Sequence, residues 1–146
     1  MIAKMFKAMW FLSVLAALGG LLWVYASLPQ QVIIQDDANG RMEASREFLF
    51  YVFTAILMIV NVLVFFVRKL SKDDTFVAWF YGVIITINIF FIVAFNVLGV
   101  YNSSESFDFS TAGIVVYLSL GLMVAWTLSW PVIAFFRKSS SKQVLA

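Results

Sequence analysis

Four runs of apolar residues divide the chain, and each is close to the roughly 20 residues that a helix needs to cross the hydrocarbon core of a bilayer. They cover residues 9–28, 48–67, 76–99 and 111–136. None shows the ten-residue alternation of a membrane β-barrel strand, and a backbone in lipid must otherwise satisfy its own hydrogen bonds as a helix. The pattern predicts an all-α membrane protein in which residues 1–146 form a single domain, a bundle of four transmembrane helices.

The polar segments between these runs predict which side of the membrane each connection occupies. Loops at 29–47 and 100–110 share one side, and a loop at 68–75 and a tail at 137–146 share the other. Short cytoplasmic segments retain Lys and Arg, so we expect both termini to be cytoplasmic. The basic residues then expected inside are Lys4, Lys7, Arg68, Lys69, Lys72, Arg137, Lys138 and Lys142, and those expected outside are Arg41 and Arg46.

The first run allows a second interpretation, as a secretory signal. Lys4 and Lys7 precede it, and Val24-Tyr25-Ala26 is similar to a small-residue cleavage site. The run is longer than the roughly 7 to 15 apolar residues that are usual in a signal. We therefore expect it to be retained as a helix.

Composition narrows the range of chemistry. Hydrophobic residues make up 63% of the 146 residues and charged residues only 12%, which excludes an ordinary water-soluble globule. The chain has no Cys and no His, so we expect no metal, no cofactor and no catalysis by thiolate or imidazole. No ionisable residue lies in the middle of a run, which disfavours a proton-coupled transporter or pump. A formal charge of +2 and the lack of a nucleic-acid motif give no reason to expect a nucleic-acid partner, and no small-molecule substrate is indicated.

Polar residues inside the runs are candidates for hydrogen bonds between helices. Counted at 1.5 Å per residue from the cytoplasmic ends, Thr54 and Asn88 reach a similar depth, about 20 Å, which predicts a hydrogen bond between them. The same count places Asn61 opposite Gly82. We interpret these residues as packing positions, with a functional role for Asn88 as the alternative.

Small residues predict where helices approach closely. Ser13, Ala16 and Gly20 line one face of the first helix. Gly121, Ala125 and Ser129 recur every fourth residue along one face of the last helix. We predict that these two faces make the tightest helix contact, either within one chain or between chains.

The longest polar stretch, residues 29–47, is the candidate recognition loop, and Asn39-Gly40 is a strong turn signal within it. Ser45 is placed to cap the second helix. A calcium site that also uses Glu43 is an alternative, although the stretch lacks the spacing of an EF-hand loop. The candidate recognition residues are Asp36, Asp37, Asn39, Gly40 and Arg41.

The first 70 or so residues resemble the domain of unknown function at the N-terminus of SdpI-type bacterial membrane proteins. The resemblance rests on Leu28-Pro29 at the end of the first helix, on Ala38-Asn39-Gly40 at a fixed interval after it, and on Ser45-Arg46 before the second helix. It implies a multi-pass protein of the bacterial inner membrane, with an external loop that recognises a ligand in immunity to a secreted toxin or in signal reception. The second half of the chain carries no motif of that family.

Three hypotheses for function follow. The first is a non-enzymatic protein of SdpI-like type that acts by contact, as a sensor or a protective protein. The second is a cofactor-free accessory subunit of a larger respiratory or secretion complex, whose partners are the lipid bilayer and other membrane subunits or a second copy of the chain. The third is a membrane enzyme, for which the carboxylate pairs Asp36-Asp37 and Asp73-Asp74 are the only candidate acid/base groups. We expect no enzymatic activity. The cytoplasmic cations are explained by topology, with binding of anionic lipid as the alternative.

Overall fold

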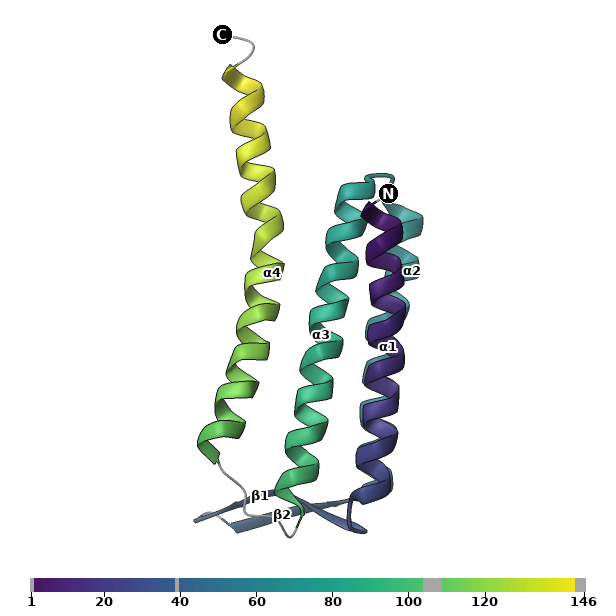
Figure 1. Cartoon of the computed structure of the whole chain (residues 1–146), viewed down its shortest axis with the longest axis vertical. Helices are drawn as coiled ribbons and strands as arrows, with labels where there is room; N and C mark the ends of the chain where they lie inside the picture. The colour runs from purple at the N-terminus through teal and green to yellow at the C-terminus, as the bar shows by residue number, and fades with distance from the viewer. Residues whose placement is uncertain (1, 39, 104–108, 144–146) are drawn as a thin grey trace.

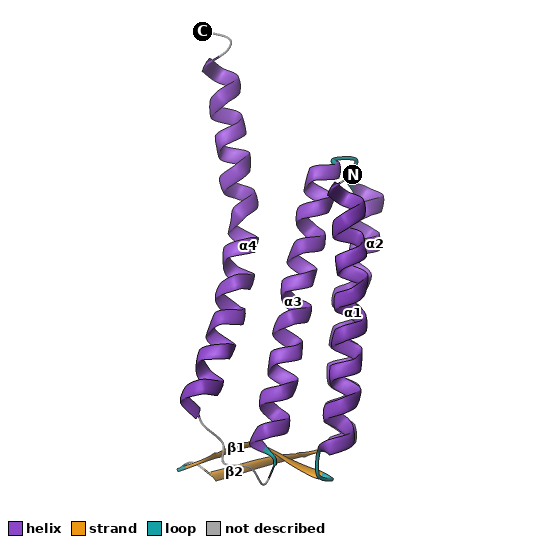
Figure 2. Cartoon of the chain, in the orientation of Figure 1, coloured by secondary structure: helices purple, strands orange, loops and turns teal. Residues whose placement is uncertain are grey.

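In a computed structural model, the described part of the chain forms four long helices and one two-stranded β-hairpin (Figure 1; Figure 2). The structure describes residues 2–38, 40–103 and 109–143, without the side chains of Asp37, 109–111 and 136–143. The elements in chain order are α1 (Ile2–Ser27), β1 (Gln31–Asp37), β2 (Gly40–Ser45), α2 (Arg46–Leu70), α3 (Asp74–Tyr101) and α4 (Phe109–Gln143).

All four helices are long and apolar enough to span a membrane, α4 over its segment Ala112–Phe135. The four predicted spans are therefore confirmed as helices, and each helix extends a few residues beyond the predicted run at one or both ends. Polar caps explain where α2 and α3 begin. The Ser45 hydroxyl accepts a hydrogen bond from the Phe48 amide at 3.2 Å, as predicted, and the Asp73 carboxylate accepts one from the Thr75 amide at 2.8 Å.

Helix α3 occupies the middle of the arrangement, because it packs against α1, α2 and α4, and most extensively against α1 (Figure 1). Helix α1 buries Trp10, Ala17, Leu21 and Val24, whose spacings of seven, four and three residues place them on one helix face. Phe95 of α3 completes an apolar cluster with Leu21 and Val24. Leu49 of α2 belongs to the same cluster, and a second cluster joins Trp10 of α1 to Val64 of α2 and Tyr81 of α3, so the three helices share two apolar contacts.

The predicted contact between the small-residue faces of α1 and α4 is wrong within one chain. A Cβ atom added at Gly20 or at Gly121 would meet nothing within 4 Å. Ala16 and Ala125 are exposed, because the buried face of α1 lies one residue further along, at Ala17. Among the described residues, Ser13 is the one member of the two faces that bonds to another helix, and the contact between copies of the chain stays a prediction.

The loop at 29–47 forms a β-hairpin, which the all-α prediction did not include. β1 and β2 pair antiparallel, from Gln31 opposite Ser45 to Asp37 opposite Gly40, with a bulge at Ile34 between the paired residues Ile33 and Gln35. Gly40 has φ +128°, a backbone conformation that glycine adopts readily, so the predicted turn at this position is confirmed. The hairpin lies across the ends of the helices (Figure 1). We call this side of the molecule the hairpin end, and the opposite side, with the start of α1 and the α2–α3 connection, the basic end.

Candidate functional site

A cluster of four polar side chains joins α1, α2 and α3 between the two ends, and we call Trp10, Ser13, Asn61 and Asn88 the polar cluster. Trp10 Nε1 donates to Asn61 Oδ1 at 2.8 Å. The Asn61 and Asn88 amides bond to each other in both directions, with Asn61 Nδ2 2.9 Å from Asn88 Oδ1 and Asn88 Nδ2 3.0 Å from Asn61 Oδ1. Asn88 Nδ2 also donates to Ser13 Oγ at 2.9 Å.

Nearly every donor and acceptor of the polar cluster is satisfied inside the protein. Asn61 Nδ2 donates to the Leu57 carbonyl at 2.8 Å, and the Ser13 hydroxyl donates to the Trp10 carbonyl at 2.7 Å. Asn88 is completely buried and Asn61 is 7% exposed. An amide pair of this kind holds no titratable proton, and its hydrogen-bonding groups are used within the fold. The arrangement therefore fits the predicted packing role.

The predicted bond between Thr54 and Asn88 is wrong. Asn88 pairs with Asn61, about two helical turns away from Thr54, and the buried Thr54 hydroxyl has no partner among the described residues. Counting depth from the helix ends assumes that neighbouring helices start level. Two amides also satisfy each other twice, whereas a hydroxyl offers one donor, so the amide pair takes precedence. Asn61 correspondingly does not pack on Gly82, which faces Trp126 of α4.

The hairpin is attached to α3 through Asn102, the residue after the helix. Its Oδ1 accepts from the Ile33 amide at 2.7 Å, and its Nδ2 donates to the Ile33 carbonyl at 3.0 Å. A neighbouring β-strand would bond Ile33 in a comparable way, and the contact lies beside the bulge at Ile34. Asn102 thus fixes one strand of the hairpin to the end of α3.

Arg46 attaches the other strand. The guanidinium donates to the Leu28 carbonyl at 3.1 Å and lies 4.8 Å from the centre of the Tyr25 ring, a cation–π contact. The Arg46 amide also bonds to the Gln30 carbonyl at 3.0 Å. Val32, fully buried, packs in the apolar cluster beneath. The base of the hairpin is therefore held from both sides, while Gly40 and Arg41 at its tip stay exposed.

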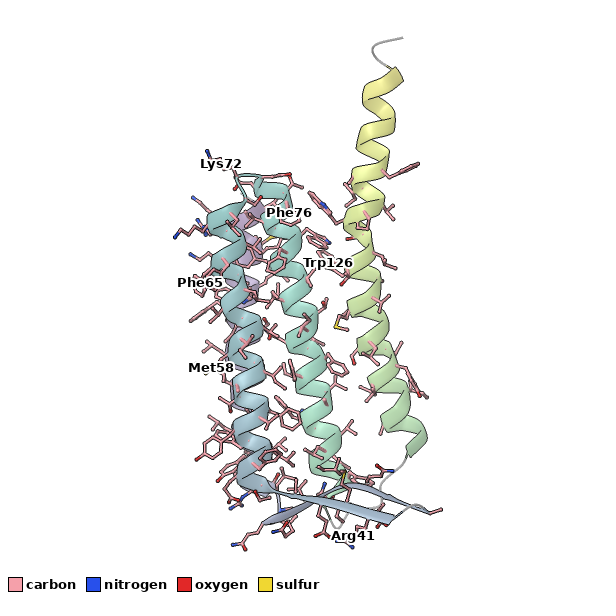
Figure 3. The ribbon with its side chains drawn as sticks, turned by 180° about the vertical axis from the view of Figure 1, so that it is seen from behind. Arg41, Met58, Phe65, Lys72, Phe76 and Trp126 are labelled. Atoms are coloured by element: carbon pink, nitrogen blue, oxygen red, sulfur yellow. The ribbon has the colours of Figure 1, made fainter. Side chains whose placement is uncertain are left out.

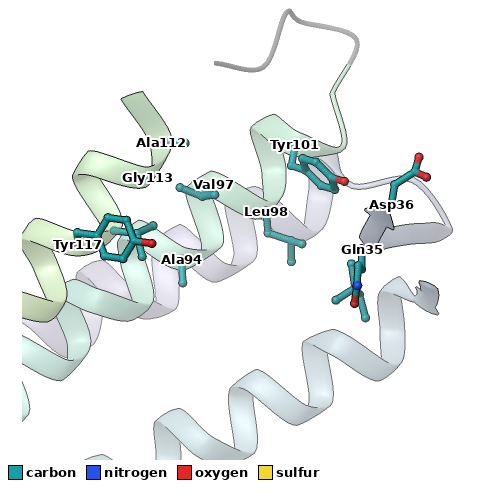
Figure 4. Close-up of a pocket in the computed structure, with 11 residues that line it drawn as sticks. Gln35, Asp36, Ala94, Val97, Leu98, Tyr101, Ala112, Gly113 and Tyr117 are labelled. Carbon is teal, nitrogen blue, oxygen red and sulfur yellow. The ribbon is translucent and has the colours of Figure 1, made fainter. Parts of the chain in front are cut away.

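A pocket of about 560 Å³ lies beside the hairpin, between α3 and α4 (Figure 4). Leu98 and Tyr101 of α3 and Gly113 and Tyr117 of α4 form much of its apolar wall. Asp36 of β1 lines it together with Ile34 and Gln35, and is exposed to solvent. The pocket thus combines an apolar interior with a carboxylate at its edge.

The predicted recognition residues divide between the pocket and the hairpin tip. Asp36 lines the pocket, and Gly40 and Arg41 lie at the tip. Asn39 and the side chain of Asp37 are outside the described part of the structure. The placement of Glu43 does not support the alternative calcium site. Glu43 forms an ion pair with Arg41, and it lies opposite Ile33, whereas Asp36 lies three residues further along β1.

Two tryptophans join α3 to α4. Trp79 Nε1 donates to the Trp126 carbonyl and Trp126 Nε1 donates to the Trp79 carbonyl, each at 3.0 Å. A Cβ atom at Gly82 would overlap the Trp126 ring, so only glycine leaves room for it. Phe76 extends the contact by packing on Trp130 with ring centroids 5.1 Å apart. Figure 3 shows Phe76 and Trp126 facing the space between the two helices, nearer the basic end than the hairpin end.

Fold and site together define a helical protein with four candidate membrane spans and a largely apolar pocket beside a β-hairpin. Comparison with models of protein families, with curated proteins and with solved structures finds no match. The resemblance to SdpI-type proteins consequently rests on the residues of the hairpin and its flanks alone.

Sequence reasoning missed Asn102 and the two pocket tyrosines, Tyr101 and Tyr117. Asn102 directly follows an apolar run, where an asparagine is typical of a helix end, so the sequence could have predicted Asn102 as the cap of that helix. Its bond to Ile33 joins residues 69 positions apart, and nothing local indicates it. Tyr101 and Tyr117 carry at most the signal of interfacial aromatic residues, and the pocket between them depends on how α4 is placed against α3.

Proposed function

We propose that this chain is a non-enzymatic protein of the bacterial inner membrane that acts by contact, as a sensor or a protective protein. Both termini then lie in the cytoplasm and the four helices form a bundle. The orientation is supported by Lys4, Lys7, Arg68 and Lys72 at the basic end, because cytoplasmic segments retain Lys and Arg. The hairpin end then faces outward, as the resemblance to SdpI-type proteins implies.

The observation that carries the proposal is an ordered hairpin beside an open apolar pocket. Asn102 and Arg46 fix the base of the hairpin, so Asp36 keeps its place at the pocket edge with little loss of entropy on binding. The connections expected outside carry more acidic than basic residues in the sequence. A cationic amphipathic peptide fits this site, with its apolar face in the pocket and a basic residue near Asp36.

A growth assay tests this function. A strain without the gene is challenged with a defined series of cationic amphipathic peptides, and wild-type protein is expected to restore growth. A Gly113→Trp variant fills the pocket and is expected to lose that protection. Leu118→Trp is the matched control, because Leu118 is 67% exposed on the same helix and lies outside the pocket. Equal protection by both variants would exclude the pocket as the site of recognition.

A second candidate function, the accessory subunit, is favoured by the exposure of α4. Only 6% of its most apolar window is buried, against 28% in α3. Gly121 and Ala125 lie on this exposed surface and leave room for another helix. Gentle purification from native membranes distinguishes the two: stoichiometric co-purification of larger subunits, lost in Gly121→Leu, supports the subunit and contradicts a stand-alone sensor.

We propose no catalytic role for the carboxylate pairs. Asp73 is engaged as the cap of α3, where its carboxylate accepts from the amides of Thr75 and Phe76. Asp74 lies beside it in the first turn of the helix, where an acidic residue is favoured by the helix dipole. Both residues thus have structural explanations.

A further inference from the structure

A second pocket, of about 500 Å³, lies at the basic end, where the start of α1 meets the α2–α3 connection. Four cations line it, two from α1 (Lys4 and Lys7), Arg68 from α2 and Lys72 from the connection. Among the described lining residues, Asp74 is the one carboxylate. Residues far apart in the sequence therefore bring a strong excess of positive charge to one concave site.

None of these four cations forms an ion pair within the part of the chain that the structure describes. The ion pairs found there are those of Arg41 with Glu43 and of Arg46 with Glu47, both at the hairpin end. Topology explains why cations lie on this side of the membrane, but it does not require that they face one pocket. Lys69 shows the difference, because it lies beside Arg68 in the chain and is not part of the lining.

The surroundings of the pocket suit a ligand with both phosphate and hydrocarbon. Ser71 and the buried Tyr81 are also among the lining residues, and each carries a hydroxyl, a group that donates to phosphate oxygens. On α2, Phe65 is 62% exposed and lies three residues before Arg68 of the lining, so the two side chains are neighbours on one helix face. The Phe65 ring also contacts Trp10 of α1, with ring centroids 5.8 Å apart, so an apolar surface on α1 and α2 adjoins the charged pocket. Free phosphate would use only the charged part.

We propose that this pocket binds the headgroup of an anionic phospholipid, with the acyl chains lying along the exposed apolar surface of α2. Four cations exceed the single charge of one phosphodiester, so a lipid with two phosphodiesters, such as cardiolipin, binds more tightly than phosphatidylglycerol. Phosphatidylcholine, which has no net charge, binds weakest. The proposal concerns the basic end and is independent of recognition at the hairpin end.

Native mass spectrometry of the full chain in detergent tests it, with each of the three lipids titrated in turn. The expected order of affinity is cardiolipin, phosphatidylglycerol, phosphatidylcholine. A double variant, Lys7→Ala with Arg68→Ala, is expected to bind cardiolipin about 30-fold more weakly, or about fivefold for each charge removed. Lys69→Ala is the matched control and is expected to stay within about twofold of wild type, because Lys69 is outside the pocket.

Three outcomes would overturn the proposal. Equal affinity for the three lipids would show that the charge of the pocket is not used. A loss per removed charge in Lys69→Ala that equals the loss per charge in the double variant would show a diffuse surface attraction in place of a site. Displacement of cardiolipin by millimolar inorganic phosphate would make a free phosphate the ligand.

Asp74→Asn keeps the test decisive if the double variant fails to insert. It removes the carboxylate of the pocket and retains every cation that sets topology, so cardiolipin binding is expected to tighten about fivefold. The capping bonds of α3 come from Asp73 and are left in place. Unchanged or weaker binding in Asp74→Asn would contradict the proposal.

Discussion

Helices α1 to α3 and helix α4 are held in different ways. The first three share the polar cluster and the completely buried Asn88 within it. Helix α4 is attached to α3 by aromatic contacts, with the reciprocal bonds of Trp79 and Trp126 near the basic end, while a pocket separates the two helices at the hairpin end. Buried amides thus join α1, α2 and α3 at mid-depth. The indole contact holds α4 near the basic end only, so most of the α4 surface is exposed and a pocket separates α4 from α3 at the hairpin end.

The largest expected effect is on the three-helix part. Asn88→Leu removes three hydrogen bonds to other helices. Asn61 keeps its bonds to Trp10 and Leu57 but loses one donor and one acceptor contact inside the fold. We expect the free energy of unfolding in mixed micelles to fall by about 2 to 3 kcal/mol. Asn96→Leu is the control, because Asn96 is exposed and its side chain donates to the Ile92 carbonyl of its own helix. Equal losses in the two variants would mean that the polar cluster stabilises nothing.

The second largest effect is expected for a substitution that weakens only the contact between α4 and α3. Gly82→Ala places a Cβ atom against the Trp126 ring, so we expect the α3–α4 contact to weaken by about 1.5 kcal/mol. The chain has no native cysteine, so spin labels on the exposed substitutions Phe66→Cys and Leu122→Cys report the distance from α2 to α4. The distance distribution should broaden in Gly82→Ala and stay narrow in Gly121→Ala, where a Cβ atom meets nothing. Broadening in both would show that steric contact at Trp126 is not what places α4.

A smaller effect is expected at the hairpin. Asn102→Ala frees the amide and carbonyl of Ile33, so hydrogen exchange over residues 31–37 should become about tenfold faster. Arg41→Ala is the comparison, because its exposed pair with Glu43 contributes about 0 to 1 kcal/mol. If both variants exchange at the wild-type rate, the hairpin is held by Arg46 and Val32 without Asn102.

The smallest expected effect has the opposite sign. The Thr54 hydroxyl is buried without a partner among the described residues, so Thr54→Val removes an unsatisfied polar group at nearly constant volume. We expect the free energy of unfolding to rise by about 0.5 kcal/mol. A loss of stability in the same micelle assay would mean that the hydroxyl has a bond that the fold does not account for.

The sequence was sufficient for the helices and insufficient for their contacts. Runs of apolar residues specify a helix locally, and Ser45 and Gly40 specify where α2 begins and where the chain turns. Contacts between helices depend on register and rotation, which local patterns do not contain. Asn88 was expected to bond across helices and does so, but with a different partner. The close helix approach was expected at Gly121 and occurs at Gly82, where the Trp126 ring leaves no room for a side chain.

The candidate site was predictable in part for the same reason. Asp36 and the tip at Gly40 and Arg41 belong to one continuous stretch, so composition and the turn signal identified them. The pocket wall at Tyr101 and Tyr117 comes from two helices, and the basic pocket comes from separate segments of the chain. Such sites exist only once the helices are placed against one another.

The reciprocal amides of Asn61 and Asn88 also bear on how the protein meets bilayers of different thickness. A slide of α2 along α3 by one turn, about 5.4 Å, would break both bonds, so α1 to α3 respond to a thinner or thicker membrane by tilting together. Helix α4, with its indole bonds near the basic end, is free to take a different tilt. Hydrophobic mismatch would then be expressed as a change in the width of the pocket between Tyr101 and Tyr117.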